Sequence, residues 1–264
     1  MKSAILIIIA LAGISYASNA QEKITSVTLT DSMTTTAIDR PGDVYIVTRS
    51  GQIQKLSTDG KLLLSFKADT VPTLFDPRDG ARLFIYFRES QLYRFMNPSF
   101  NPLSTFEVDP AFAIQPWLIC PSGEYKLWIL DQADNSLKKV DIQTGRVEVE
   151  VVVGPDILDD ASNFTAMREY QGFVFLLNPT RGIEIFNPLG IHIRSIEAPG
   201  IRNFNFLGED LYYLKDDVLV FFNLFSATTL QQTVGKGYEQ ALVSEDRLML
   251  FTPLRVDIFS FTHP

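Results

Sequence analysis

The chain has 264 residues, with 23 Lys and Arg against 31 Asp and Glu, and a formal net charge of −8 at pH 7. This acidic balance argues against a nucleic-acid partner, which requires a basic face to offset phosphate charge, and the 46% of apolar residues argue against an unstructured chain. A single cysteine, Cys120, excludes an intrachain disulfide framework and any zinc site built from several cysteines.

The first twenty residues are typical of a secretory signal peptide. Lys2 provides a positive start, residues 4–12 (AILIIIALA) form a short apolar run, and residues 18–20 place small side chains before Gln21. The apolar run is too short to span a bilayer, and no cysteine follows it to carry a lipid anchor. We therefore predict an exported protein with a mature chain of residues 21–264; the alternative is an N-terminal anchor helix.

Short apolar runs recur along the rest of the chain, at spacings of 37 to 47 residues. They are residues 44–47 (VYIV), 83–86 (LFIY), 127–130 (LWIL), 174–177 (VFLL), 211–214 (LYYL) and 248–251 (LMLF). Each run is rich in aromatic and β-branched residues and is bounded by turn residues. This pattern predicts a strand that is buried on both faces.

Each apolar run lies in a similar local context. A shorter apolar segment precedes it, and a polar turn such as residues 39–43 (DRPGD) or 168–172 (REYQG) separates the two. An alternating segment such as residues 52–56 (QIQKL) follows, and alternation indicates a strand with one buried face. A second turn and a weaker fourth strand, such as residues 61–66, complete the unit.

Four strands per unit of roughly 40 residues, with no helical periodicity between units, is the period of a β-propeller blade. A helical solenoid would require a 3.6-residue period, and a sandwich or barrel has no reason to repeat a buried strand at this interval. We predict an all-β, six-bladed β-propeller with four-stranded blades. The predicted blades are residues 36–68, 73–108, 115–153, 163–198, 203–235 and 238–264.

The two ends of the chain complement each other in this prediction. The last unit has only three strands, whereas residues 24–30 (ITSVTLT) form a spare strand ahead of the first unit. We expect this N-terminal strand to complete the last blade, which closes the ring and covers an exposed sheet edge.

The units resemble six-bladed propellers of the NHL-like and quinoprotein-like kind over residues 24–264, and Gln21 after the cleavage site resembles exported proteins of Bacteroidota. Quinone-cofactor propellers carry tryptophan docking motifs between blades. Trp117 and Trp128 are too few for such motifs. The resemblance therefore implies a fold and no activity, and we expect no cofactor.

Acidic side chains recur near the turn between the first and second strands of the units. They form an expected acidic collar around one mouth of the axial channel: Asp39, Asp43, Asp76, Asp79, Glu124, Glu169, Glu209, Asp210, Glu245 and Asp246. One interpretation is a site for a cation or a basic partner. The other is that Asp and Gly populate tight turns for backbone reasons, and we expect no metal site.

No nucleophile or acid–base pair is recognisable in the sequence. His192 lies in an alternating strand and is expected at the surface, with no Ser or Cys partner, and His263 lies at the end of the chain. Cys120 opens a turn beside a buried strand and is expected to pack as a small apolar residue. We therefore predict no catalytic residues.

Apolar residues in the turns between third and fourth strands are candidate partner-binding positions, because exposed apolar groups rimmed by polar ones mark protein-binding surfaces. We call these residues the turn tips: Met96, Phe100, Leu103, Leu189, Leu224 and Phe225. The alternative is that the tips fold back under neighbouring blades.

These features together predict a non-catalytic, periplasmic protein-interaction subunit with no transmembrane helix. Its layout is similar to that of the propeller subunit of the outer-membrane protein assembly complex. The expected partner is an outer-membrane β-barrel or its complex, and an accessory or channel-capping subunit of the type IX secretion translocon is the specific hypothesis.

Two alternatives remain open at this stage. The first is a lactonase-like or lyase-like hydrolase with a divalent cation on the propeller axis, in which Asp39 or Glu169 would be essential. The second is a carbohydrate-binding propeller that stacks sugars on exposed aromatic rings.

Overall fold

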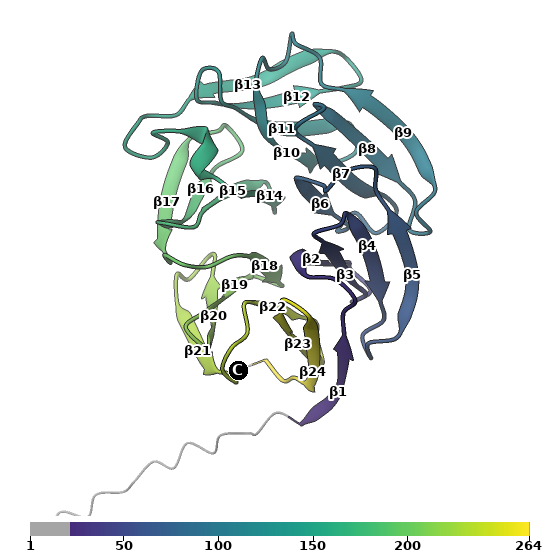
Figure 1. Ribbon diagram of the computed structural model, residues 1–264. Helices are drawn as coiled ribbons and strands as arrows, with labels where there is room; N and C mark the ends of the chain where they lie inside the picture. Colours follow the sequence, from purple (N-terminus) through teal and green to yellow (C-terminus); the bar gives the residue numbers. More distant parts are fainter. Residues whose placement is uncertain (1–21, 264) are drawn as a thin grey trace, which may run out of the picture.

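The computed structural model describes residues 22–263, which form six four-stranded antiparallel sheets arranged in a ring (Figure 1). One short 3-10 helix, η1 (Ala161–Asn163), precedes the fourth sheet. The expected signal peptide, residues 1–20, lies outside the described residues. Within residues 22–263, the structure contains no helix long and apolar enough to cross a membrane.

Each sheet is a meander whose first strand lies nearest the centre of the ring and whose fourth strand lies at its rim (Figure 1). The first blade comprises β2 (Met33–Ile38), β3 (Val44–Thr48), β4 (Gln52–Leu56) and β5 (Leu62–Lys67); the second, β6 (Leu74–Asp76), β7 (Leu83–Phe87), β8 (Leu92–Met96) and β9 (Pro102–Glu107). The third comprises β10 (Pro116–Ser122), β11 (Lys126–Asp131), β12 (Ser136–Asp141) and β13 (Arg146–Val152); the fourth, β14 (Ala166–Tyr170), β15 (Phe173–Asn178), β16 (Gly182–Phe186) and β17 (His192–Glu197). The fifth comprises β18 (Phe204–Leu207), β19 (Asp210–Lys215), β20 (Val218–Asn223) and β21 (Thr229–Thr233); the sixth, β22 (Gln240–Val243), β23 (Arg247–Thr252), β24 (Arg255–Ser260) and β1 (Lys23–Thr28).

The prediction of a six-bladed propeller is confirmed by this architecture, and the repeated apolar runs are its second strands. β3 and β7 are buried at every position, because each lies between two strands of its own sheet and between two neighbouring blades. β5 is exposed at nearly every position, since a fourth strand has a free edge at the rim. The burial gradient from centre to rim explains why the fourth strands are the weakest in the sequence.

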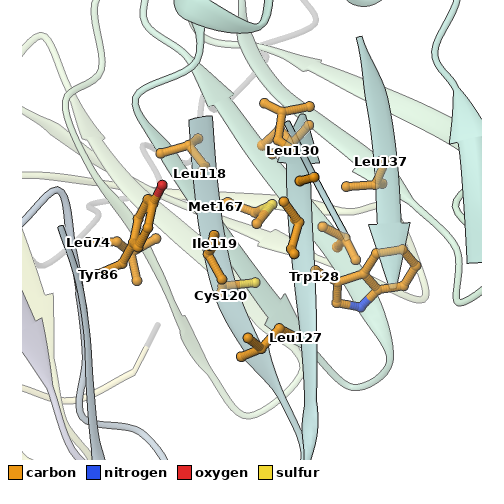
Figure 2. Close-up of a cluster of buried hydrophobic side chains, with 14 of the residues drawn as sticks. Leu74, Tyr86, Leu118, Ile119, Cys120, Leu127, Trp128, Leu130, Leu137 and Met167 are labelled. Atoms are coloured by element: carbon orange, nitrogen blue, oxygen red, sulfur yellow. The ribbon is translucent and has the colours of Figure 1, made fainter. Parts of the chain in front are cut away.

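Facing blades pack through large apolar side chains. Figure 2 shows Leu118 and Cys120 of β10 in one cluster with Trp128 of β11 and Met167 of β14, all fully or almost fully buried. Burial of each large side chain of this kind contributes roughly 1.5–3 kcal/mol. Cys120 does not open a turn, because β10 continues to Ser122 and Cys120 pairs with Trp128 across the ladder. Burial raises the pKa of its thiol, so Cys120 acts as a packed apolar residue.

The N-terminal strand closes the ring as predicted. β1 pairs antiparallel with β24 as the fourth strand of the sixth blade (Figure 1). The residue that follows β1, Leu29, donates its main-chain N–H to Leu254 O at 2.8 Å. The same bond recurs in the other five blades, where a buried Ala or Val after the fourth strand donates to the turn between the second and third strands: Ala68 to Gly51, Val108 to Gln91, Val153 to Asn135, Ala198 to Arg181 and Val234 to Asp217.

The buried carboxylate of Asp257 binds two side chains of β1, the strand that closes the ring. Asp257 of β24 is 1% exposed and accepts hydrogen bonds from Ser26 Oγ of β1 at 2.6 Å and from Tyr238 OH at 2.6 Å. Lys23 Nζ of β1 lies 2.9 Å from its Oδ1. Burial alone would raise the pKa of Asp257, but these hydrogen bonds and the charge of Arg255 lower it to about 2.

Replacement of Asp257 by Asn should therefore destabilise the ring. The folded-state pKa is depressed, so the contribution of Asp257 is present above a pH of about 4 and is lost as the pH falls towards 2. We expect Asp257→Asn to lower the free energy of unfolding by about 2 kcal/mol at neutral pH, and the difference from the unmodified protein to shrink over that acidic range. Urea unfolding at several pH values measures both effects.

Asp69→Asn is the matched control, because the Asp69 side chain is 89% exposed and its nearest cation, on Arg94, is 3.8 Å away. This variant should change the free energy of unfolding by no more than about 0.5 kcal/mol. Equal stability of Asp257→Asn and the unmodified protein at neutral pH would contradict the role given to Asp257.

Candidate functional site

A cavity of about 1160 Å³ lies where the first hairpin turns of the six blades converge. The six first strands run in the same direction about the axis, so these turns emerge on one face of the ring. We call this face the cavity face. Residues from every blade line the cavity, including Pro41, Asp79, Gly123, Gln171, Gly208 and Glu245.

Most of the expected acidic collar lies on the wall of this cavity. The lining members are Asp39, Asp76, Asp79, Glu124, Glu169, Glu245 and Asp246. The other three lie outside it: Asp43, Glu209 and Asp210. The Asp210 carboxylate instead lies 2.9 Å from the imidazole of His263.

Three collar residues lie on strands and not in turns, and one of them, Asp210, is the first residue of β19. Asp76 ends β6, and Glu169 lies in β14, which continues to Tyr170. The expected turn at residues 168–172 is therefore only Gln171 and Gly172, whose φ angles of 50° and 84° suit a two-residue hairpin turn. As a result, Arg168 and Glu169 belong to the inner strand of the fourth blade.

Several of the collar carboxylates form ion pairs with basic side chains. Lys55 Nζ lies 2.9 Å from Asp43 Oδ2 and 3.5 Å from Asp39 Oδ2, and Arg82 Nη2 lies 2.9 Å from Asp79 Oδ2. Within residues 22–263, no group of three or more His, Cys, Asp or Glu side chains is placed to hold a metal ion.

Asp39 is one of the buried carboxylates at the cavity wall. Tyr45 OH donates a hydrogen bond to its Oδ2 at 3.1 Å. Burial raises the pKa of Asp39, although the hydrogen bond from Tyr45 and the charge of Lys55 oppose the shift. Burial also raises the pKa of Tyr45 to about 12. Asp39 is thus a partner of Lys55 and Tyr45 at the cavity wall.

Arg78 links three blades around the axis. From the second blade, its guanidinium forms an ion pair with the buried Asp76 and donates to Glu169 O of the fourth blade at 2.9 Å. It also lies over the Phe206 ring of the fifth blade, 5.9 Å from the centroid. Burial alone would raise the pKa of Asp76, but the charge of Arg78 and its hydrogen bonds hold that pKa below the ordinary value.

A second buried polar network lies beside it. Arg168 Nη2 donates to Asn203 Oδ1 at 3.3 Å, and Asn203 Nδ2 donates to Thr36 O at 3.0 Å. Thr36 Oγ1 donates in turn to Gln240 Oε1 at 2.9 Å, so the network joins the fourth, fifth, first and sixth blades. Burial, together with the like charge of Arg78, lowers the pKa of Arg168 to about 10.

Sequence reasoning missed these arginines because it treated the turns as acidic. The signal was present: basic residues alternate with the acidic ones in the same segments, as in residues 39–43 (DRPGD) and 76–82 (DPRDGAR). The mixed charge of these segments explains why the cavity wall is an ion-pair network and not a uniformly acidic ring.

The turn tips divide into buried and exposed residues. Met96 is fully buried and Phe100 is 7% exposed, so the expectation that these two form an open surface is wrong. The reason is local backbone geometry: Phe100 has a φ of 62°, and its ring turns back between the first two blades, where it stacks on Phe66 at a centroid distance of 5.6 Å. Leu224 is half-buried against the neighbouring core.

The other three turn tips are open to solvent. Leu103, Leu189 and Phe225 are 56%, 63% and 65% exposed. Turns between third and fourth strands emerge at the same end of a meander as those between first and second strands, and the contacts agree with this. Leu224 N, for example, donates to Glu209 O at 3.0 Å. The exposed tips therefore lie on the cavity face, outside the cavity itself.

His192 has partners that the sequence did not reveal. Its Nε2 lies 2.8 Å from Glu184 Oε2 and 3.3 Å from Ser195 Oγ, and Ser195 Oγ itself donates to Glu184. In a catalytic triad the acid and the nucleophile contact different imidazole nitrogens. Here both meet Nε2, and the hydroxyl is bound to the carboxylate. The three residues form a cross-strand polar cluster without the geometry of an activated nucleophile.

The tryptophans do not offer a sugar platform. Trp128 is fully buried, and the guanidinium of Arg88 lies 3.5 Å from the centroid of the Trp117 ring. Trp117 Nε1 donates to Phe164 O at 2.8 Å, which fixes the ring between blades.

Comparison with known proteins identifies the fold. No protein-family model matches the chain, and no curated protein matches it. Among solved structures, the Pan2 WD40 domain of Neurospora crassa is similar, with a TM-score of 0.57 at 11% identity, covering 94% of this chain and 97% of that one. BamB from Moraxella catarrhalis gives a TM-score of 0.49 at 13% identity, covering 92% of this chain and 98% of that one. At such identities the likeness is one of fold alone: the chain is a β-propeller.

The ion pair between Asp76 and Arg78 should be essential for stability. Replacement of Arg78 by Met leaves the buried Asp76 carboxylate without its direct partner, and loss of one member of a buried pair costs about 3 kcal/mol. We expect Arg78→Met to lower the free energy of unfolding by that amount in urea titrations. A double variant that also carries Asp76→Asn should recover part of the loss, since it removes the uncompensated charge.

Arg82→Met is the control, because Arg82 pairs with the half-exposed Asp79 in the same turn. Its cost should be about 1 kcal/mol or less. Equal losses in the free energy of unfolding for the two arginine variants would show that the Asp76–Arg78 pair stabilises the fold no more than an exposed pair does.

Proposed function

We propose that this propeller is a non-catalytic protein-interaction subunit that binds its partner through the cavity face. The observation that carries the proposal is the presence of three large, exposed apolar side chains, Leu103, Leu189 and Phe225, on the face that also holds the cavity. Apolar groups rimmed by polar and charged ones are typical of protein-binding surfaces. The described residues include no group of three or more His, Cys, Asp or Glu side chains placed to hold a metal ion, and the His192 cluster lacks catalytic geometry.

We further propose that the protein acts in the periplasm, as part of an outer-membrane assembly or secretion complex. The predicted signal peptide at residues 1–20 supports export, and the Bacteroidota-like residue Gln21 favours a secretion machine of that group. The expected partner is an outer-membrane β-barrel or its complex, and an accessory or channel-capping subunit of the type IX translocon is the specific form of the proposal.

Capture of the partner tests this function. The tagged protein is purified from detergent-solubilised envelopes, and the eluate is identified by mass spectrometry. We expect a large outer-membrane β-barrel at near-equal stoichiometry. Replacement of Leu103, Leu189 and Phe225 together by Ser should reduce its recovery at least about tenfold, because the loss of apolar burial at an interface core of this kind exceeds 1.4 kcal/mol.

The matched control carries Ser at Val71, Ile114 and Leu254. These residues are 42%, 70% and 51% exposed, and they lie on the opposite face, in inter-blade connections or in a turn between second and third strands. The control variant should retain the β-barrel. Loss of the partner in the control but not in the turn-tip variant would assign binding to the other face, and recovery of the propeller alone would contradict membership of an envelope complex.

A further inference from the structure

The axial cavity has an acidic wall even after its ion pairs are considered. Asp39, Asp76, Asp79 and Asp246 each contact a Lys or Arg side chain. Among the described residues, the lining carboxylates without such a pair are Glu124, Glu169 and Glu245, and the lining arginine without one is Arg40. A neutral ligand would leave this negative charge uncompensated.

Three buried polar atoms on this wall have no hydrogen-bond partner within residues 22–263. They are Nδ2 of Asn205, a residue that is 1% exposed, Oε2 of Glu169, and Oγ of Ser244 in the sixth blade. The Asn205 amide orientation is fixed, because Phe206 N donates to its Oδ1 at 2.9 Å. Buried polar side-chain atoms are paired in the large majority of cases, so an unpaired donor and an unpaired acceptor on one cavity wall indicate a missing partner.

Asn205 of β18 and Glu169 of β14 occupy corresponding positions along two neighbouring inner strands. The ring of Tyr170, which follows Glu169, stacks on the ring of Phe206, which follows Asn205, at 4.1 Å and an interplanar angle of 4°. The residues that precede them also correspond, because the guanidinium of Arg168 lies over the Phe204 ring. One ligand placed between β14 and β18 could therefore meet both residues.

We propose that the axial cavity receives a basic peptide segment of the partner, with Glu169 binding a Lys or Arg side chain and Asn205 binding a main-chain carbonyl. This inference rests on the proposed protein-interaction function and specifies its chemistry. Glu169 accepts hydrogen bonds and prefers a cationic donor, whereas Asn205 Nδ2 only donates and needs an acceptor. An Arg or Lys residue within a peptide supplies both groups close together.

The size and charge of the cavity suit such a segment. Its volume of about 1160 Å³ exceeds the roughly 300–1,000 Å³ of a pocket for a drug-sized molecule. Glu124 and Glu245, from the third and sixth blades, add negative charge around the cavity. The positive charge of Arg78 is offset by its ion pair with Asp76. A second copy of this chain, with its net charge of −8, is disfavoured as the occupant.

Peptide binding to the purified protein tests the inference. The probe is a short, acetylated and amidated peptide of alternating Gly and Arg with a fluorescent label, and its binding is followed by anisotropy at low salt. A peptide with citrulline in place of Arg keeps the shape and the main-chain carbonyls but loses the charge. We expect the Arg peptide to bind, and the citrulline peptide to bind at least about tenfold more weakly.

Variants of the cavity wall locate the site. Glu169→Gln should weaken binding of the Arg peptide about tenfold, and Asn205→Ser should weaken the Arg and citrulline peptides alike, since it removes the carbonyl-binding donor. Glu124→Gln with Glu245→Gln changes only side chains at the cavity wall away from the core, and should also weaken binding. Glu209→Gln is the matched control, because Glu209 lies on the same face but does not line the cavity, and it should leave binding unchanged.

The outcomes separate this inference from the proposed function. Equal binding of the Arg and citrulline peptides, preference for an acidic peptide, or full binding by both the Glu169→Gln and the Glu124/Glu245 variants would each overturn the cavity inference. If the turn-tip variant still loses the β-barrel in that case, the protein-interaction function stands without it. If the Arg peptide binds but no β-barrel is captured, the cavity inference is supported and membership of an envelope complex is contradicted.

Discussion

Closure of the ring is the constraint on which the rest of the structure depends. Each blade has two apolar faces, and both are buried only when every blade has two neighbours. The first and last blades share one apolar cluster, which includes Ile46 of β3 and Met249 of β23. β1 completes the last blade, and the chain then continues directly into the first blade. The bonds of Asp257 to β1 therefore hold together the two blades that are furthest apart in sequence.

Closure also determines what lies on the axis. Six inner strands converge there, and their buried polar side chains hydrogen-bond to one another across blades. Arg78 and Arg168 do so across blades that are distant in sequence, as the contact of Arg78 with Glu169 O shows. Such charged pairs stabilise a fold less than apolar packing would. The unpaired atoms of Glu169 and Asn205 among these polar side chains are the basis of the binding role that we propose for the axis.

Periodicity predicted the architecture because burial in a propeller repeats with the blade. The run of residues 44–47 and its five equivalents are buried for the same reason, so one pattern reveals all six blades. Contacts between blades have no such local signal. The inward ring of Phe100 depends on a left-handed turn residue, and the partners of Arg78 lie dozens of residues away. The sequence thus predicted which turns face the cavity, but not which side chains in them are free.

The two faces of the ring differ in their main-chain hydrogen bonds and in the exposure of their side chains. On the face opposite the cavity, the residue after each fourth strand is buried and bonds to a neighbouring turn in all six blades, as Leu29 does to Leu254 and Ala68 to Gly51. The main chain of that face therefore holds the end of each fourth strand to the turn between the second and third strands of its own blade. The cavity face consists of hairpin turns, and the side chains of turn tips such as Leu189 and Phe225 are exposed there. Side chains can vary there without loss of the ring, which is the condition under which a scaffold acquires a binding surface.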